Sequence, residues 1–221
     1  MKRTLRTRGV LLTAIACLTL GGTACGSAAS RDAASPGAGS AAPAKVATSA
    51  TVLAPDRPFG AGCAAVSAAA PGSMSAMAHD PVVLAASRNP VLSSFVINVQ
   101  RANLADPFNS QQGITVLLPV NQAFAAVPAP SLHRLLSDTA TLTQVLTHHV
   151  IPGRLTPGEL VGTHTTLDND TVTITASGAV FTVGAGQTVA GTKAATVICG
   201  NVQTANATLY MIDGLLKPPA S

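Results

Sequence analysis

The chain has 221 residues, of which 13 are basic and 9 acidic, and its formal net charge is +4. Four of the basic residues fall within the first eight positions, so the rest of the chain carries 9 basic and 9 acidic residues and is neutral. A neutral chain with one Tyr, five Phe and no Trp lacks the basic surface and stacking aromatic side chains of nucleic-acid-binding proteins. This composition excludes nucleic acid as a partner.

Residues 1–24 have the pattern of a bacterial lipoprotein signal peptide that ends before Cys25. A basic start is followed by an apolar run over residues 10–20, which is shorter than the roughly 20 residues that span a bilayer. Small residues then lead to Cys25, although Gly22 stands where such motifs prefer Leu. Lipidation of Cys25 would make the membrane a partner, because several acyl chains anchor firmly. The alternative is ordinary secretion with cleavage near Ala24.

Residues 25–58 are predicted to form a disordered spacer after the lipidated cysteine, and residues 59–221 a single folded domain. The spacer consists mainly of Ala, Ser, Gly, Pro and Thr, without bulky or periodic positions. Such a segment cannot bury enough apolar surface to offset the loss of chain entropy on folding. The spacer would separate the domain from the membrane, so we expect an extracytoplasmic protein that is lipid-anchored to the cell membrane or surface-exposed, and in part secreted.

Two cysteines remain after Cys25, namely Cys63 and Cys199. An exported chain with one remaining pair favours a disulfide, and two unpaired thiols are the alternative. A metal site is disfavoured because no CxxC or CxxH spacing occurs.

Helical patterns dominate the first part of the domain. Residues 74–86 carry apolar side chains at helical spacing, with a break at Asp80-Pro81, and Asn89-Pro90 is a typical helix start. A buried strand is predicted at 114–118, followed by a short helix that Asn121 caps and that holds Phe124. Two more helices are predicted at 131–136 and 139–147, the second capped by Asp138.

After residue 152 the pattern changes to alternating β-branched residues separated by Gly, Asn and Asp. A short helix is predicted around Glu159, starting at Thr156-Pro157. Antiparallel strands are predicted at 163–167, 171–175, 180–183, 196–199 and 208–212. Helices followed by strands indicate the α+β fold class.

The sequence offers no catalytic or metal-binding constellation. It contains no G-x-S-x-G, no HExxH and no P-loop, and Glu159 is its single glutamate. His148 and His149 are adjacent and, on a strand, would point to opposite faces, which predicts one buried and one exposed ring. We therefore expect no enzyme activity, no metal and no cofactor.

Three segments in order resemble the blocks of the fasciclin domain. They are residues 114–124 (ITVLLPVNQAF), 146–153 (LTHHVIPG) and 206–218 (NATLYMIDGLLKP), and the resemblance covers roughly residues 73–219. The chain departs from the family at Val120, where Thr is usual, and at His148, where Tyr is usual. The chain is most similar to the small secreted and lipid-anchored fasciclin antigens of actinobacteria.

The resemblance implies a wedge-shaped β-sandwich flanked by helices and used for adhesion. It also implies a Cys63–Cys199 bridge and structural roles for the motif residues Pro119, Asn121, Phe124, His149 and Asp213. Phe124 would fill the core, and the polar three would hold turns by hydrogen bonds. An integrin-contact role known near the central block in animal relatives is not carried over, because the tyrosine is missing.

Two hypotheses of function follow. The first is a non-catalytic adhesion lipoprotein that binds a protein or polysaccharide partner at the cell surface. The alternative is a small-ligand or lipid-binding envelope lipoprotein, which requires an apolar pocket. An envelope hydrolase is a third and weaker hypothesis, because it requires scattered Ser, His and Asp residues to converge. Fold alone does not decide among them.

Overall fold

A computed structural model describes residues 57–67 and 73–219. The predicted signal peptide, Cys25 and nearly all of the predicted spacer lie outside these ranges. Among the described residues, no helix has the length and apolarity needed to cross a membrane.

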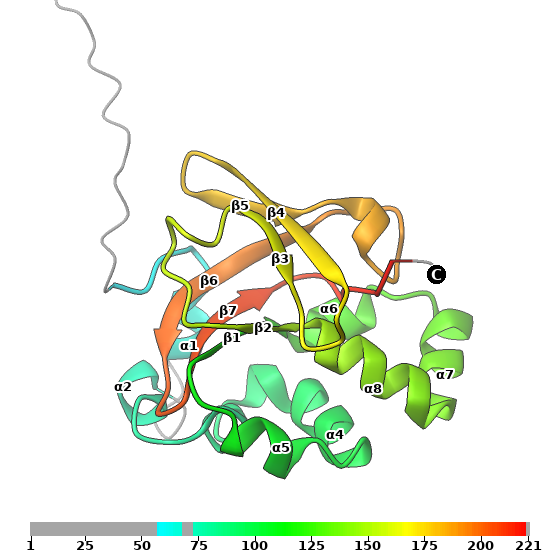
Figure 1. Cartoon of the computed structure of the whole chain (residues 1–221), viewed down its shortest axis with the longest axis horizontal. Helices are drawn as coiled ribbons and strands as arrows, with labels where there is room; N and C mark the ends of the chain where they lie inside the picture. The colour runs from blue at the N-terminus through cyan, green and yellow to red at the C-terminus, as the bar shows by residue number, and fades with distance from the viewer. Residues whose placement is uncertain (1–56, 68–72, 220–221) are drawn as a thin grey trace, which may run out of the picture. The chain divides into compact units, whose positions relative to one another are not determined.

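Seven strands of the described ranges form one sheet in the order β2-β1-β7-β6-β5-β4-β3 (Figure 1). They are β1 (Ile114–Pro119), β2 (Val150–Pro152), β3 (Gly162–Thr165), β4 (Thr171–Ser177), β5 (Val180–Val183), β6 (Ala195–Gln203) and β7 (Ala207–Ile212). The α+β class is confirmed. The strands after residue 162 pair antiparallel as predicted, but β1 and β7 run parallel, with Ile114 opposite Ala207. Residues 120–206, which contain several helices and strands β2 to β6, separate these two strands in the chain and provide the long crossover that parallel pairing requires.

The sheet curls until its two outer strands approach each other. The N–H of Leu167, just after β3, donates a hydrogen bond to the carbonyl of Val150 in β2, with 2.8 Å between the atoms. The sheet therefore nearly closes between its outer strands β2 and β3, which gives it a barrel-like form with an inner and an outer face.

Two apolar cores lie on the two faces of the central strands. In β1, Val116 and Leu118 pack toward the helices, whereas Leu117 points into the curled sheet. In β7, Leu209 and Met211 face the helices, whereas Tyr210 and Ile212 face inward. Both strands are buried along their whole length, which explains why they read as continuous apolar runs rather than alternating ones.

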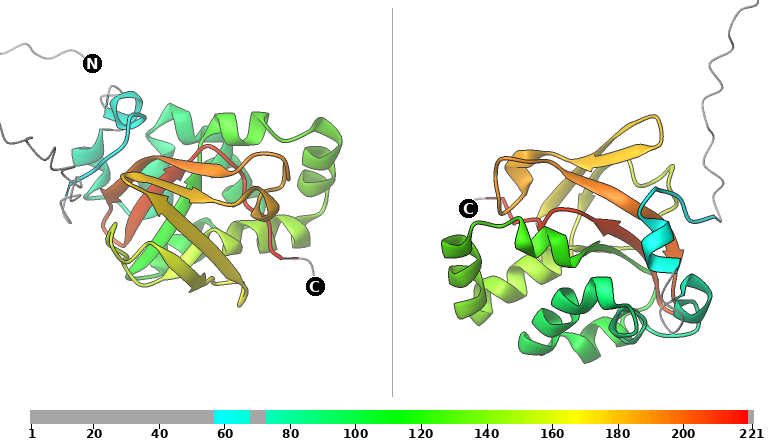
Figure 2. Two further views of the ribbon diagram at one scale, coloured as in Figure 1. Left: turned by 90° about the horizontal axis from the view of Figure 1, so that it is seen from above. Right: turned by 180° about the vertical axis from the view of Figure 1, so that it is seen from behind.

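Helices cover one side of the sheet, as the view from behind shows (Figure 2). They are α1 (Cys63–Ser67), α2 (Met74–Met77), α3 (Val82–Ser87), α4 (Ser93–Arg101), α5 (Ala105–Ser110), α6 (Asn121–Ala125), α7 (Ala129–Ser137) and α8 (Thr139–His148). The short 3-10 turns η2 (Pro90–Leu92) and η3 (Ala185–Gln187) complete the described elements.

Most predicted helix boundaries are close to those observed. The break at Asp80-Pro81 separates α2 from α3, and the Asn89 side chain accepts from the Val91 N–H at 3.1 Å, so η2 begins where predicted. Asp138 caps α8 through the Ala140 N–H at 3.0 Å. The helix predicted around Glu159 is wrong. A single turn is observed there, in which the Thr156 N–H donates to the Glu159 carboxylate. Gly158 lies within this turn and Gly162 follows it, so too few residues remain for a helix.

Candidate functional site

Residues 59–63, here called the entrance segment, lead the chain into the domain along β6. Phe59 exchanges two backbone hydrogen bonds with Gly200, at 3.1 and 2.8 Å, and the Gly62 N–H donates to the Ile198 carbonyl at 2.8 Å. Strand β5 pairs with β6 only at Ala195 and Thr196. The entrance segment therefore provides hydrogen-bond partners for the backbone of β6 beyond the point where its pairing with β5 ends.

A disulfide between Cys63 and Cys199 fastens the same segment. It closes a loop with a sequence separation of 136 residues, and the Cys199 side chain is completely buried. The bond present is the one that the cysteine count favoured. It holds the first turn of α1 directly against β6.

The close approach of the entrance segment to β6 depends on glycine. Gly60 has a φ of +109°, and a Cβ there would overlap the Ile198 carbonyl. A Cβ on Gly62 would lie 3.0 Å from both the carbonyl oxygen and the Cβ of Ile198. Larger residues at these positions would push the entrance segment off the strand.

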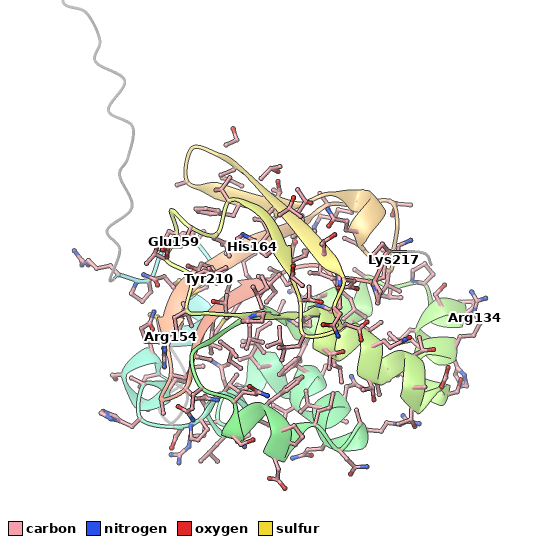
Figure 3. The ribbon with its side chains drawn as sticks, in the orientation of Figure 1. Arg134, Arg154, Glu159, His164, Tyr210 and Lys217 are labelled. Carbon is pink, nitrogen blue, oxygen red and sulfur yellow. A yellow bond between two sulfur atoms is a disulfide. The ribbon has the colours of Figure 1, made fainter. Side chains whose placement is uncertain are left out.

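Aromatic side chains seal the segment against the inner core. The Phe59 ring lies 5.2 Å from the Phe181 ring and 6.2 Å from the Tyr210 ring, centroid to centroid. The Tyr210 hydroxyl donates to the Leu155 carbonyl at 2.9 Å. Burial and the nearby Glu159 carboxylate raise the pKa of the Tyr210 phenol above its ordinary value; both residues lie at the same end of the sheet (Figure 3).

A groove of about 390 Å³ opens beside the entrance segment. Its walls come from α1, η2 and the start of α6, and its floor from β6. The lining residues are Gly62, Ala65, Val91, Val120, Asn121, Gln122 and Ile198. The size is within the range of small-ligand pockets, and the lining is apolar apart from two neutral amides.

Ile198 reaches the groove because the β6–β7 ladder is irregular there. The register shifts between Val197 and Cys199, so the regular alternation of inward and outward side chains is interrupted at Ile198. Sequence reasoning assigned 196–199 to a strand but had no signal for this irregularity. Val91, whose side chain is only partly covered, also borders the groove.

Asn121 forms the polar end of the groove and stabilises a different helix from the one predicted. Its Oδ1 accepts from the Ser94 N–H at 2.9 Å, and its Nδ2 donates to the Pro90 carbonyl at 2.8 Å. The expected cap of its own helix is wrong, because Val120 occupies the N-cap position of α6 and Asn121 is the first helical residue. Its side chain projects outward and caps α4 instead.

The motif residues Pro119 and Phe124 flank this position. Pro119 ends β1 opposite Ile212 of β7, at the last paired position of the parallel ladder. Phe124 is buried in the helix-side core. Together they set where β1 stops and how α6 packs, and so fix Asn121 at the groove.

The two adjacent histidines are both buried, which corrects the prediction of one buried and one exposed ring. His148 ends α8 and His149 is its C-cap residue, so the alternation of a strand does not apply. The His148 Nδ1 lies 2.7 Å from both carboxylate oxygens of Asp170, which also accepts from the Thr166 hydroxyl. Sequence spacing could not reveal this pair, since its members are 22 positions apart with strands β2 and β3 between them.

His149 joins the end of α8 to the C-terminal segment. Its Nδ1 lies 2.6 Å from the Val145 carbonyl, and its Nε2 accepts from the Leu216 N–H at 3.0 Å. Burial, together with a smaller effect of the neighbouring His148, lowers the pKa of His149 to about 3 against the raising effect of the Val145 bond. The ring is therefore neutral at physiological pH.

Asp213 holds the turn after β7. Its carboxylate accepts from the Thr196 N–H at 2.6 Å and from the Lys193 ammonium at 2.6 Å. Its own N–H donates to the Thr196 carbonyl at 3.1 Å. The three polar motif residues thus lie far apart in the chain and each stabilises a separate junction; the structure does not gather them into one site.

The chemistry available to the described residues is limited. Within residues 57–67 and 73–219, no group of three or more His, Cys, Asp or Glu side chains is placed to hold a metal ion. The His148–Asp170 pair resembles two members of a catalytic triad, but the buried Nε2 of His148 has no hydrogen-bond partner among the described residues. Among residues 57–67 and 73–219, therefore, no hydroxyl or thiol is bonded to this nitrogen to complete a triad.

Comparison with known proteins gives consistent results. The Fasciclin domain family model matches residues 90–218. The chain is 41% identical over 169 residues to immunogenic protein MPB70 of Mycobacterium bovis, covering 73% of this chain and 82% of that one. It is 39% identical over 170 residues to cell surface glycolipoprotein MPB83 of the same species, covering 73% of each. A solved FAS1 domain pair from insect fasciclin I aligns at 26% identity with a TM-score of 0.47, covering 60% of this chain and 47% of that one.

Proposed function

Because the chain belongs to the fasciclin-domain family, we propose that it is a non-catalytic interaction module of the cell surface. In this proposal a lipid on Cys25 tethers it to the outer face of the membrane, and the domain binds a protein or polysaccharide partner. The relative MPB83 is named as a cell surface glycolipoprotein, which is consistent with this location.

The observation that carries the proposal is the attachment of the entrance segment. Any tether on Cys25 pulls on the domain through residues 59–63, and these are held to β6 by a disulfide and three backbone hydrogen bonds. Tension would therefore reach the middle of the sheet rather than peel away a terminal helix. A module that links two surfaces benefits from this arrangement, because its survival under load depends on the rate of forced unfolding.

Binding is tested with the whole exported protein, its Cys63–Cys199 bond intact, on immobilised cell envelope, wall polysaccharide and matrix proteins. We expect saturable binding to at least one surface, and loss of that binding after reduction and alkylation. Absence of binding to all three would reject the interaction module.

The tether is tested separately by metabolic labelling with radioactive palmitate. The wild-type chain should incorporate label and partition into detergent, whereas Cys25→Ser should do neither while still being exported. Equal labelling of both chains would place the acyl group elsewhere and reject Cys25 as the anchor.

The groove supports one alternative, a carrier of a small apolar ligand. Its volume suits part of an acyl chain, and Ala65, Val91 and Ile198 would contact that chain. Native mass spectrometry of the purified protein should then show a co-purifying lipid, and Ala65→Phe should exclude it. A protein that carries no ligand and binds no added fatty acid would leave only the interaction module.

A further inference from the structure

Exposed threonines gather on the outer face of strands β3, β4 and β5. In the run Thr171-Val172-Thr173-Ile174-Thr175, the valine and isoleucine are buried and the three threonines are exposed. Thr163 and Thr165 of β3 are likewise exposed. The alternation follows directly from the two-residue period of a strand, with the apolar residues in the inner core.

Strand register brings these threonines into rows. Thr165 lies opposite Thr171, Thr163 opposite Thr173, and Thr175 opposite Thr182. The hydroxyl oxygens are 3.0 Å apart in the pair Thr163–Thr173 and 3.0 Å apart in the pair Thr175–Thr182. We call these six residues the threonine face.

The threonine face is regular. The β3–β4 and β4–β5 ladders run without a register shift, in contrast to the ladder between β6 and β7. Neighbouring strands are spaced by about 4.8 Å, and alternate residues along a strand by about 6.7 Å. Seen from above, these strands lie in front of the helices (Figure 2). The strand register and the exposure of the threonines make their hydroxyls repeat along and across the strands, which a repeating polymer can match.

The threonine face carries no ionised side chain. Strands β3, β4 and β5 contain no Asp, Glu, Lys or Arg. Asp168 and Asp170 lie in the turn between β3 and β4, where they accept hydrogen bonds from Thr147 and Thr166 respectively. Such a surface offers a charged partner no ion pair, and it lacks the aromatic and arginine anchors typical of protein interfaces.

Threonine hydroxyls suit a partner that is itself rich in hydroxyls. Each one donates one hydrogen bond and accepts others, and the β-branched side chain has little rotamer freedom to lose on binding. On the basis of the proposed interaction function, we propose that the threonine face binds an uncharged polysaccharide, with sugar hydroxyls bonding along its rows.

The test measures binding of the whole exported protein, with its disulfide intact, to insoluble β-1,4-glucan, chitin and β-mannan, with polygalacturonate as a charged polymer. The variant Thr163→Val/Thr173→Val removes two hydroxyls that partner each other, so it leaves no unpaired group and retains β-branched shape. We expect saturable binding of the wild type to an uncharged polymer, weakened about tenfold or more in this variant.

The matched control is Thr139→Val/Thr192→Val, which makes the same chemical change at two exposed positions outside the threonine face. It should bind as the wild type does, and all three proteins should unfold cooperatively. Equal binding by the face variant, preference for polygalacturonate, or no binding to any polymer would overturn the proposal. If the variant still binds cell envelope like the wild type, the interaction function stands and only the threonine face is rejected; if the wild type binds no surface at all, the function itself fails.

Discussion

The imidazole Nε2 of His149 accepts a hydrogen bond from the backbone N–H of Leu216, 3.0 Å away, across 67 positions of the chain. Both residues are buried, and the bond joins the last turn of α8 to the segment that follows β7. This bond requires a neutral ring with a free lone pair on Nε2. The stability of the domain therefore depends on the protonation of one side chain.

Acid should destabilise the domain through His149. The unfolded residue takes up a proton near pH 6.5, whereas the folded residue does so only near pH 3, because burial lowers its pKa. Stability contributed by the neutral ring is complete above pH 6.5 and is lost as the pH falls toward 3, by up to about 1.4 kcal/mol per pH unit. Urea unfolding at several pH values should show this slope, and His149→Gln should flatten it; an identical slope in the variant would contradict the assignment.

Removal of the disulfide should loosen the groove before it unfolds the core. The variant Cys63→Ser/Cys199→Ala is expected to lose about 2–5 kcal/mol of stability, because the bond closes a long loop. Hydrogen exchange should accelerate first at the Phe59 and Gly62 amides, which depend on the entrance segment. Unchanged protection at these two amides in the variant would mean that hydrogen bonding alone holds the segment.

Loss of the Asn121 side chain should destabilise α4 rather than α6. In Asn121→Ala the Ser94 N–H loses its acceptor and the Pro90 carbonyl loses one of its donors, at a cost of about 1–2 kcal/mol. Gln122→Ala, at the exposed neighbouring position, is the control and should change stability by less than about 0.5 kcal/mol. Thermal unfolding and amide exchange at Ser94 provide the measurement, and equal effects of the two substitutions would argue against the cap.

Asn206 should be among the least replaceable polar residues. Its Oδ1 accepts from the Val82 N–H at 2.8 Å, and its Nδ2 donates to the Phe108 and Gln111 carbonyls at 2.8 and 2.7 Å. The buried amide thus ties α3 and α5 to the start of β7. Asn206→Ala should cost more than about 2 kcal/mol, because it leaves buried groups unpaired.

Asn206→Asp provides the sharper comparison at the same position. The aspartate keeps an acceptor for the Val82 N–H, but its second oxygen faces the backbone carbonyls to which the amide donates. Because oxygen would face oxygen, Asn206→Asp should lower the stability of the domain at pH 7 more than Asn206→Ala does. Denaturant titrations at pH 7 and pH 4 compare the two variants. If aspartate proves harmless at pH 7, the amide is not the donor described.

Sequence patterns predicted the parts of the fold that follow from local periodicity. Strand 180–183 and the starts of η2 and α8 were located correctly, because β-branched alternation and the Asn89 and Asp138 caps are local signals. Strand β2 and helix α5 were missed. Strand β2 has three residues and is defined by its pairing with β1, and α5 contains Pro107, which weakens any helical pattern.

The candidate sites depended on contacts that no local pattern encodes. The partner of Asn121 is the N-terminus of another helix, and Asp170 meets His148 only because the β3–β4 turn folds back on α8. The groove arises where α1, η2, α6 and β6 converge, and its lining is drawn from residues far apart in sequence. The threonine alternation was visible in the sequence, but its alignment into rows required the strand register.

The position of β7 also determines when the domain can form. This last strand lies between β1 and β6, so without it these two central strands have no ladder to join them. In the β1–β7 ladder, Ile114 pairs with Ala207, which lies far from it in the sequence. Pairing between strands so distant in the chain is slow to form. A nascent or translocating chain therefore has no stable native sheet until its C-terminus emerges, and truncation before residue 207 should abolish folding rather than shorten the domain.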